Sequence, residues 1–132
     1  MDKYGLIGYP LGHSFSISYF NQRFADEGIN AKYINFEIPS IDELPEVLAK
    51  NPELRGLNVT IPYKEKVIDF LDSVSPEARA IGAVNVIKVS HEGNKVILMG
   101  YNSDVIGFTQ SIEPMLRSRS EERFSRNAET DL

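Results

Sequence analysis

The stretch GLIGYPLGHSFSIS, residues 5–18, changes from a strand pattern to a helix pattern within a few positions. It begins inside an apolar run, Tyr4–Tyr9, that is typical of a short buried strand and ends at a proline, which cannot donate to a β-ladder. Beyond the serines, apolar residues recur at helical spacing up to Gly28, a residue type that commonly ends helices. The stretch therefore predicts a strand, a turn and a helix over 16–27.

The glycines of this stretch, Gly5, Gly8 and Gly12, are spaced three and four residues apart. The dinucleotide-binding fingerprint instead has two glycines two apart and a third three further on, where a helix opens. The spacing therefore excludes that fingerprint from this loop. Glycine here allows either a plain tight turn or the close approach of a ligand to the backbone.

Further strand and helix signals alternate along the chain. A second strand is predicted over Ala31–Ile38, and Ser40 with Glu43 has the sequence pattern of a helix capping box. The segment 56–71 then changes from a strand pattern to a helix pattern at Pro62, because proline is suited to the first turn of a helix. These signals repeat the strand-turn-helix unit.

The remaining signals are a short helix, a strand over Ala83–Val89 and a strand that begins at Val96. The two strands form a hairpin in which Gly93 or Asn94 takes a positive φ. A last helix is predicted from its apolar residues, Val105, Ile106, Phe108, Ile112 and Leu116. Together the elements predict the α/β class, as a three-layer α-β-α sandwich with a mostly parallel sheet and one antiparallel hairpin.

Composition limits the class of protein. The chain has 132 residues, 42% of them apolar and 25% charged, which is typical of one globular domain. A net charge of -5 without a basic stripe argues against nucleic acid as a partner, and the absence of cysteine excludes disulfides and thiol chemistry. Because we find neither a signal peptide nor an 18-residue apolar run, we expect a cytoplasmic protein that does not contact membranes.

Residue usage changes after position 116. Residues 1–116 contain seven Lys and three Arg, whereas residues 117–132 contain four Arg and no Lys. We expect one folded domain over 1–116. The segment 117–132 is then either a disordered or marginally helical tail or a sequence foreign to the domain.

Three serines, Ser14, Ser16 and Ser18, precede or begin the first predicted helix. Free backbone N–H groups and the positive end of the helix dipole favour an anion there, and serine hydroxyls can donate to a carboxylate. The alternative is that one serine is simply the N-cap. His13 has no second ligand near it in the sequence, so we expect no metal site.

A polar cluster follows in the middle of the chain. Asn58 and Thr60 lie two residues apart on one predicted strand, so their side chains share a face. Lys64 lies near the start of the predicted helix, where the dipole disfavours a cation and a lysine suggests another role. The alternative is an ordinary lysine that faces solvent.

Two more polar residues flank the predicted hairpin, Asn85 at its start and Asp104 after its end. Because ligands of open parallel sheets bind at the carboxyl ends of strands, we expect Lys64 and Asp104 to meet there. A lysine and an aspartate within hydrogen-bond reach can pass a proton to or from a hydroxyl. Asp104 as the N-cap of the last helix is an alternative that is compatible with this role.

Four motifs in this order, GHSFS, NVTIPYK, GAVN and GYNSD, resemble those of the N-terminal, substrate-binding domain of the shikimate dehydrogenase family. The resemblance covers residues 1 to about 116. It implies that Ser14 and Ser16 bind a carboxylate and that Lys64 and Asp104 are the catalytic pair. It also implies that ring hydroxyls are held by Asn58, Thr60, Asn85 and Asp104.

The family catalyses the reversible, NADP-linked reduction of 3-dehydroshikimate to shikimate. Hydride transfer to the ring carbonyl leaves an alkoxide, which Lys64 would protonate directly or through water while Asp104 orients it. The resemblance places the NADP site on a C-terminal Rossmann domain that these residues do not include. We therefore expect a chain that folds, binds shikimate weakly and does not turn over alone, with exposed patches that favour a homodimer or other self-association.

The chain departs from the family pattern at three positions. Ile17 stands where the family usually has proline, and Ser103 stands where it has threonine. Val86 replaces a threonine and removes one hydroxyl near the site. Two alternatives stay open: a quinate/shikimate dehydrogenase-type fragment, with NAD or NADP, and a non-catalytic module that binds small carboxylates.

Overall fold

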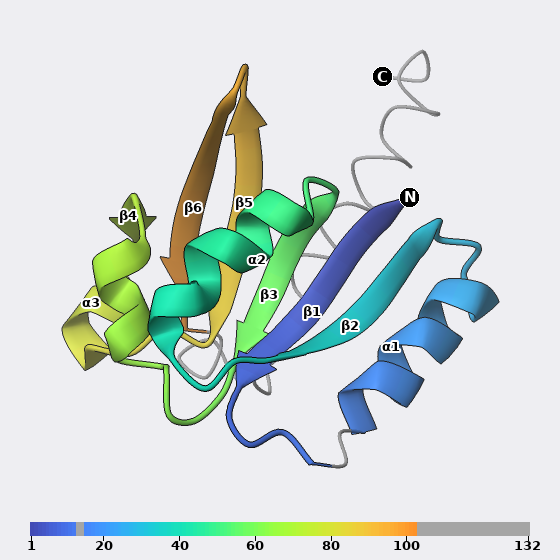
Figure 1. Cartoon of the computed structure of the whole chain (residues 1–132), viewed down its shortest axis with the longest axis horizontal. Helices are drawn as coiled ribbons and strands as arrows, with labels where there is room; N and C mark the ends of the chain where they lie inside the picture. Colours follow the sequence, from blue (N-terminus) through green and yellow to red (C-terminus); the bar gives the residue numbers. More distant parts are fainter. Residues whose placement is uncertain (13–14, 103–132) are drawn as a thin grey trace, which may run out of the picture.

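The structure is a computed structural model that describes residues 1–12 and 15–102 (Figure 1). Its elements, in chain order, are β1 (Asp2–Gly8), α1 (Phe15–Asp26), β2 (Ala31–Glu37), the 3-10 helix η1 (Ile41–Glu43), α2 (Leu44–Lys50), β3 (Leu54–Val59), the 3-10 helix η2 (Lys66–Phe70), β4 (Ser73–Val74), α3 (Pro76–Ile81), β5 (Val86–Glu92) and β6 (Lys95–Tyr101). The predicted last helix and the predicted domain boundary at residue 116 lie outside the described residues. Within those residues, no helix is long and apolar enough to cross a membrane.

The six strands form one mixed sheet in the order β2-β1-β3-β5-β6-β4. Strand β1 pairs in parallel with β2 and β3, and β4 pairs in parallel with β6. Strand β5 is antiparallel to β6, which is the predicted hairpin, and also to β3. The second antiparallel pairing arises because the chain returns from α3 to the edge at which β3 ended, so that Val86 at the start of β5 lies beside Asn58 near the end of β3.

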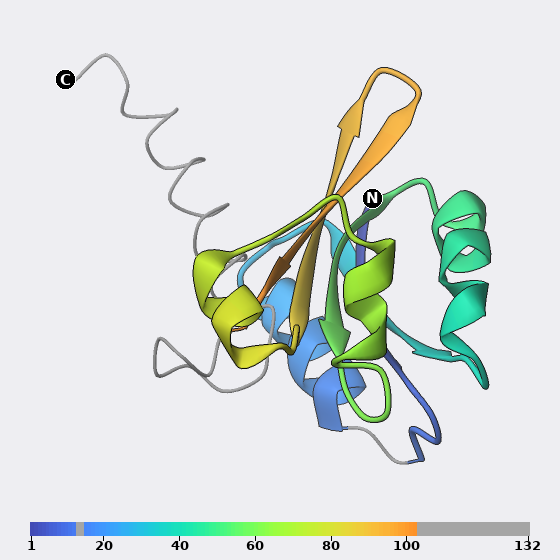
Figure 2. The same cartoon turned by 90° about the vertical axis from the view of Figure 1, so that its left-hand side faces the viewer.

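Helices cover both faces of the sheet, which confirms the α/β class (Figure 2). On one face, α1 packs Phe20 and Phe24 against Tyr4 and Tyr33, and the rings of Phe20 and Tyr33 stack with their centroids 4.8 Å apart. On the other face, η1, α2, η2 and α3 cover a larger apolar core. Its fully buried members include Ile7, Leu44, Leu57, Val67, Ala78 and Ile87.

The capping box predicted at Ser40 is present. The Ser40 hydroxyl accepts a hydrogen bond from the backbone N–H of Asp42, and the Glu43 carboxylate accepts one from the Ser40 N–H. It caps the short helix η1, which leads directly into α2. In the hairpin, Gly93 is the residue with positive φ, at 63°.

The helix predicted to begin at Pro62 does not begin there. Residues 61–62 and 64–65 form turns, and η2 starts at Lys66. The reason is Tyr63, whose ring is buried in the core and whose N–H donates to the Thr60 carbonyl at 3.0 Å, closing a turn over the positions that a helix would need. Lys64 therefore lies in a turn and not in the first turn of a helix.

The strand predicted from Ala83 also begins later, at Val86. The N–H groups of Val84 and Asn85 donate to the carbonyls of Lys64 and Tyr101, at 2.8 and 3.0 Å. Val84 and Asn85 are consequently bonded to the Lys64 turn and to the end of β6, and the strand begins only after them.

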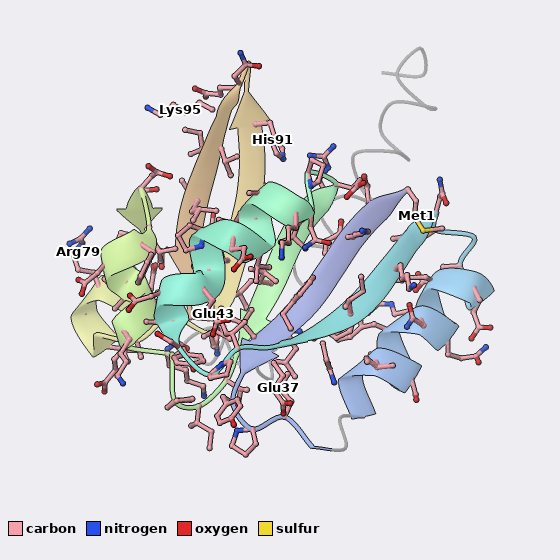
Figure 3. All side chains as sticks on the ribbon, in the orientation of Figure 1. Met1, Glu37, Glu43, Arg79, His91 and Lys95 are labelled. Carbon is pink, nitrogen blue, oxygen red and sulfur yellow. The ribbon has the colours of Figure 1, made fainter. Side chains whose placement is uncertain are left out.

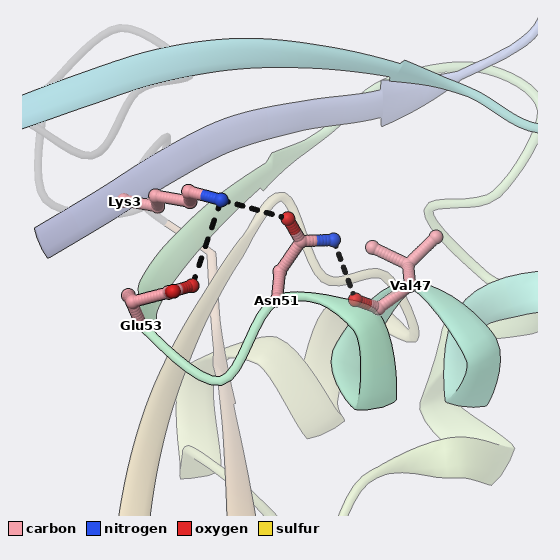
Figure 4. A network of polar contacts seen from close by, with 4 residues as sticks. All are labelled: Lys3, Val47, Asn51 and Glu53. Carbon is pink, nitrogen blue, oxygen red and sulfur yellow. Dashed lines mark hydrogen bonds and ion pairs between the residues drawn. The ribbon is translucent and has the colours of Figure 1, made fainter.

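The amino ends of β1 and β3 are held by a polar network (Figure 4). The Lys3 ammonium donates to Asn51 Oδ1 at 3.3 Å and lies 3.5 Å from a carboxylate oxygen of Glu53. The Asn51 amide donates in turn to the Val47 carbonyl of α2 at 2.8 Å. This network fixes the end of α2 at the sheet edge opposite to the carboxyl ends of β1 and β3.

Candidate functional site

The strand order contains a topological switch point between β1 and β3. From the carboxyl end of β1 the chain passes through α1 to β2 on one side, whereas from the carboxyl end of β3 it passes through η2 to β4 at the opposite edge of the sheet. The two connections diverge and leave a crevice outside the carboxyl ends of β1 and β3, where ligands of open α/β sheets bind. In Figure 1 these ends lie at the bottom of the sheet, beside the start of α1.

The loops that follow β1 and β3 border this crevice, and their backbones are hydrogen-bonded to each other. The Thr60 N–H donates to the Ile7 carbonyl at 3.0 Å, and the Tyr9 N–H donates to the Ile61 carbonyl at 3.2 Å. The pairing of β1 with β3 thus continues past the ends of both strands. The start of the loop after β1 is therefore joined to the loop after β3.

Gly8 explains how closely these loops approach. A Cβ atom at position 8 would overlap the Thr60 methyl group and lie 2.8 Å from Leu11 Cδ2. The same loop is fastened to β2 by Glu37, which accepts a hydrogen bond from the Leu11 N–H at 2.6 Å and lies at the carboxyl end of that strand (Figure 3). The glycine therefore serves the packing of loop on loop.

Lys64 lies in the turn after β3, and its side chain is half-buried. The turn is anchored by Tyr63, which is 2% exposed and donates its phenol proton to the Ile38 carbonyl. Burial, followed by the nearby Glu43 carboxylate, raises the pKa of the Tyr63 phenol, so that the group stays neutral and able to donate. Within residues 1–12 and 15–102, the Lys64 ammonium has no hydrogen-bond or ion-pair partner.

Asn85 and Asn102 lie beside this turn. Asn85 is fully buried, and its backbone carbonyl accepts a hydrogen bond from the Val59 N–H at 2.8 Å. Asn102 follows β6 and donates from its amide to the Ala83 carbonyl at 3.2 Å. The start of β5 and the end of β6 are therefore joined to the end of β3 at one edge of the sheet.

Asn58 lies on β3, on the face that α1 covers, and is 4% exposed. Its amide Nδ2 donates to the phenol oxygen of Tyr33 at 2.8 Å. Tyr33 is fastened in turn to α1, because the Asn21 side chain accepts from the Tyr33 N–H at 2.9 Å and donates to its carbonyl at 3.2 Å. The middle of α1, through Asn21, and the strand residue Asn58 are therefore both attached to Tyr33.

The structure brings together four of the predicted site residues, Asn58, Thr60, Lys64 and Asn85, around the carboxyl end of β3. Ser16 lies in the first turn of α1, which starts at that same edge. Ser14 and Asp104 lie outside the described residues. The meeting of Lys64 with Asp104 and the binding of a carboxylate by the serines remain predictions.

Sequence reasoning missed Tyr33, Tyr63 and Asn21 as supports of the site. Tyr33 lies in a predicted strand and Tyr63 follows Pro62, and neither position suggested more than an ordinary core aromatic residue. A signal was present nonetheless, because a buried tyrosine usually needs a partner for its hydroxyl. Asn21 was a similar signal, because asparagine is unfavourable inside a helix unless its side chain has a hydrogen-bonding role.

The glycines of β1, Gly5 and Gly8, do not fit a dinucleotide cofactor. A pyrophosphate needs open space above glycine backbone, whereas the space above Gly5 is taken by the Ile34 carbonyl oxygen, 2.5 Å from a Cβ placed there. The space above Gly8 is taken by Thr60. In this part of the chain, no three carboxylate or imidazole groups are placed to hold a metal ion.

Comparison with known proteins gives a consistent assignment. Residues 6–87 match the family described as shikimate dehydrogenase substrate binding domain. The NADP(+) shikimate dehydrogenase of Syntrophomonas wolfei is 49% identical over 110 residues, which are 82% of this chain and 36% of that protein.

Solved structures agree in fold. Shikimate dehydrogenase 1 from Peptoclostridium difficile is 40% identical with a TM-score of 0.70, over 81% of this chain and 40% of that one. A shikimate 5-dehydrogenase from Thermus thermophilus, in complex with NADP(H) and shikimate, is 34% identical with a TM-score of 0.69, over 86% of this chain and 42% of that one.

This chain spans 36% to 42% of the length of these three proteins. The match to the family covers more than half of the chain and includes the β1–α1 loop, the Lys64 turn and Asn85. The chain therefore belongs to the shikimate dehydrogenase substrate binding domain family.

Proposed function

We propose that this chain forms the substrate-binding and proton-handling part of an NADP-linked shikimate dehydrogenase, which reduces 3-dehydroshikimate to shikimate. The observation that carries the proposal is the Lys64 turn. It is held at the switch-point crevice by the Val84 N–H and by the buried Tyr63, and it presents an ammonium with no described partner. Asn58, Thr60 and Asn85 border the same place.

Substrate binding is assigned to groups at two ends of the crevice. Ser14 and Ser16, at the start of α1, take the carboxylate, which backbone N–H groups and the helix dipole favour. Asn58, Thr60, Asn85 and Asp104 take the ring hydroxyls. Because the loops are joined by backbone hydrogen bonds, both ends of the substrate are held at once and the reacting carbon is fixed near Lys64.

Lys64 handles the proton. Reduction of a ring ketone leaves an alkoxide, and an ammonium within reach can protonate it directly or through one water. Asp104 orients the lysine. Anchoring of the turn through Tyr63 keeps the Lys64 backbone in place, so that the ammonium needs to move only through its own side-chain torsions.

No residue of this chain is proposed to supply or bind the source of the hydride. The relative from Syntrophomonas wolfei is named for NADP(+), and the Thermus thermophilus structure holds NADP(H) with shikimate. Gly5 and Gly8 of β1 have no open space beside their backbone for this cofactor. NADP therefore enters the proposal as the cofactor of the whole enzyme, and this chain supplies the substrate site.

Titration of the ¹⁵N-labelled chain with shikimate tests the binding part of the proposal. We expect chemical-shift changes that saturate and that cluster at residues 58–64 and 84–86, with a smaller response to quinate. Lys64→Ala should weaken binding severalfold. Lys66→Ala, which removes an exposed lysine two residues away, is the matched control and should not. Absence of any saturable response would refute the proposal.

Turnover is tested in a chimera in which residues 1–116 replace the matching part of the Syntrophomonas wolfei enzyme. The chimera should oxidise shikimate with NADP+, and Lys64→Ala should lower kcat far more than it raises KM. Equal kcat for the chimera and its Lys64→Ala variant would remove Lys64 from the chemistry. A chimera that prefers quinate or NAD would favour the corresponding alternative.

The remaining predictions belong to this proposal as well. They are a domain over 1–116 with a separate tail over 117–132, a cytoplasmic location and self-association of the chain. Tyr9 and Ile61, 44% and 70% exposed at the edge of the crevice, provide an apolar surface for self-association. Sedimentation of the chain over a range of concentrations tests self-association, and a mass that stays at that of the monomer would refute it.

A further inference from the structure

Asn58 belongs to a row of directly paired residues that crosses the sheet. The strand register places Leu6 opposite Asn35 and Asn58, and Asn58 opposite Val86. Directly paired residues point to the same face of a sheet. Leu6 and Val86 pack in the apolar cluster under α1, so the Asn58 amide lies in an apolar layer.

The two ends of the Asn58 amide are not equivalent. Nδ2 donates to the Tyr33 phenol oxygen at 2.8 Å. Oδ1 is fully buried and has no hydrogen-bond partner among the described residues. A buried carbonyl oxygen without a partner is unfavourable by about 1–3 kcal/mol, so it calls for an explanation such as a ligand that it receives.

Tyr33 determines which end of the amide is engaged. Its backbone is gripped by the Asn21 side chain on both its N–H and its carbonyl, and its ring stacks on Phe20. The residue is 1% exposed. The phenol oxygen is therefore held in place from α1 and β2 together, and it reaches over β1 to meet an amide on β3.

We propose that Tyr33 is a positioning residue that fixes the Asn58 amide so that Oδ1 is the acceptor offered to the ligand. The ligand group at this point must then be a donor, that is, a ring hydroxyl and neither a ketone oxygen nor a carboxylate. The inference rests on the proposed function, because it takes the ligand to be a hydroxylated ring. It adds that Asn58 selects a hydroxyl and that the selection depends on Tyr33.

The test is a double-mutant cycle on shikimate affinity, measured by NMR titration of the full 132-residue chain. Tyr33→Phe keeps the ring but removes the phenol oxygen, and the freed amide should bind shikimate about tenfold more weakly. In the Asn58→Ala background, the same Tyr33→Phe change should alter the Kd less than twofold, because Tyr33 acts through the amide. Should Asn58→Ala not fold, Asn58→Leu, which fills more of the volume, takes its place.

Asn51→Ala is the stability control. It removes a hydrogen-bonded amide at the opposite end of the strands and should leave the Kd within twofold of the wild type. A Tyr33→Phe effect that persists without Asn58, or an unchanged Kd in Tyr33→Phe, overturns the inference while the proposed function stands. An unchanged Kd in Asn58→Ala overturns the inference and also removes Asn58 from the proposed substrate site, while the role of Lys64 stands. A wild-type chain that binds no shikimate overturns both.

Discussion

Replacement of Tyr63 by phenylalanine tests whether a buried phenol holds the Lys64 turn. The substitution keeps the ring in the core and removes only the hydroxyl that donates to the Ile38 carbonyl. Ile38 is 5% exposed, so its carbonyl loses a partner that water cannot readily replace. We expect Tyr63→Phe to lower the free energy of unfolding by about 1–3 kcal/mol.

Thermal and urea denaturation, followed by circular dichroism, measure this change. For a domain of this size, each kcal/mol lowers Tm by roughly 4 °C, so a Tm drop of about 4–12 °C is expected. Tyr9→Phe is the matched control, because its phenol is on a side chain 44% exposed, and it should change stability by less than about 0.5 kcal/mol. Equal stability of Tyr63→Phe and wild type would refute the anchoring role.

The pH dependence gives a second check on the same bond. Because burial raises the pKa of Tyr63 in the folded state, the folded chain holds the phenol proton more tightly than the unfolded chain does. The stability that this proton contributes is complete below the ordinary tyrosine pKa of about 10 and is lost as the pH rises through the raised value. The stability gap between wild type and Tyr63→Phe should therefore narrow above about pH 10.

Three further substitutions probe other parts of the structure. Gly8→Ala should destabilise the chain by about 1–3 kcal/mol and weaken shikimate binding, because the new Cβ overlaps Thr60; denaturation and titration measure both. Ser40→Ala should lower the free energy of unfolding by about 1 kcal/mol through loss of the capping box, and an unchanged urea midpoint would contradict this. Asn35→Leu should raise stability by roughly 1 kcal/mol without changing shikimate affinity, because the buried Asn35 Oδ1 has no partner among the described residues; a loss of affinity would instead make Asn35 part of the site.

Much of the fold could be predicted from local patterns. The strand Asp2–Gly8, the helix Phe15–Asp26 and the strand Ala31–Glu37 each agree with a sequence pattern to within a few residues. Apolar periodicity and the capping residue Ser40 are local signals, and these elements bury the faces that the periodicity marked. The two-residue strand β4 had no such pattern and was not predicted.

The errors occurred where long-range contacts outweigh local preference. Pro62 suits the first turn of a helix, yet the burial of Tyr63 and its bond to Ile38, 25 residues away, impose a turn instead. Likewise Val84 carries a strand-forming side chain but donates its N–H to Lys64. Neither partner can be identified from a window of neighbouring residues. The same limit applies to the site: the position of Lys64 just after a strand could be predicted, whereas the contacts of Tyr63 and Val84 that hold its turn could not.

Two buried tyrosines hold the candidate site from opposite faces of one sheet. Tyr63 packs in the core under α2 and anchors the turn that carries Lys64, whereas Tyr33 packs under α1 and engages Asn58. Both use an aromatic ring for packing and a phenol oxygen for position, so replacement by phenylalanine conserves the first property and removes the second. Because the two phenols act on different groups, the lysine proposed to handle the proton and the amide proposed to bind a hydroxyl should respond to separate substitutions. A loss of turnover in Tyr63→Phe but not in Tyr33→Phe would then indicate a defect in proton transfer. A loss in Tyr33→Phe but not in Tyr63→Phe would indicate a defect in substrate recognition.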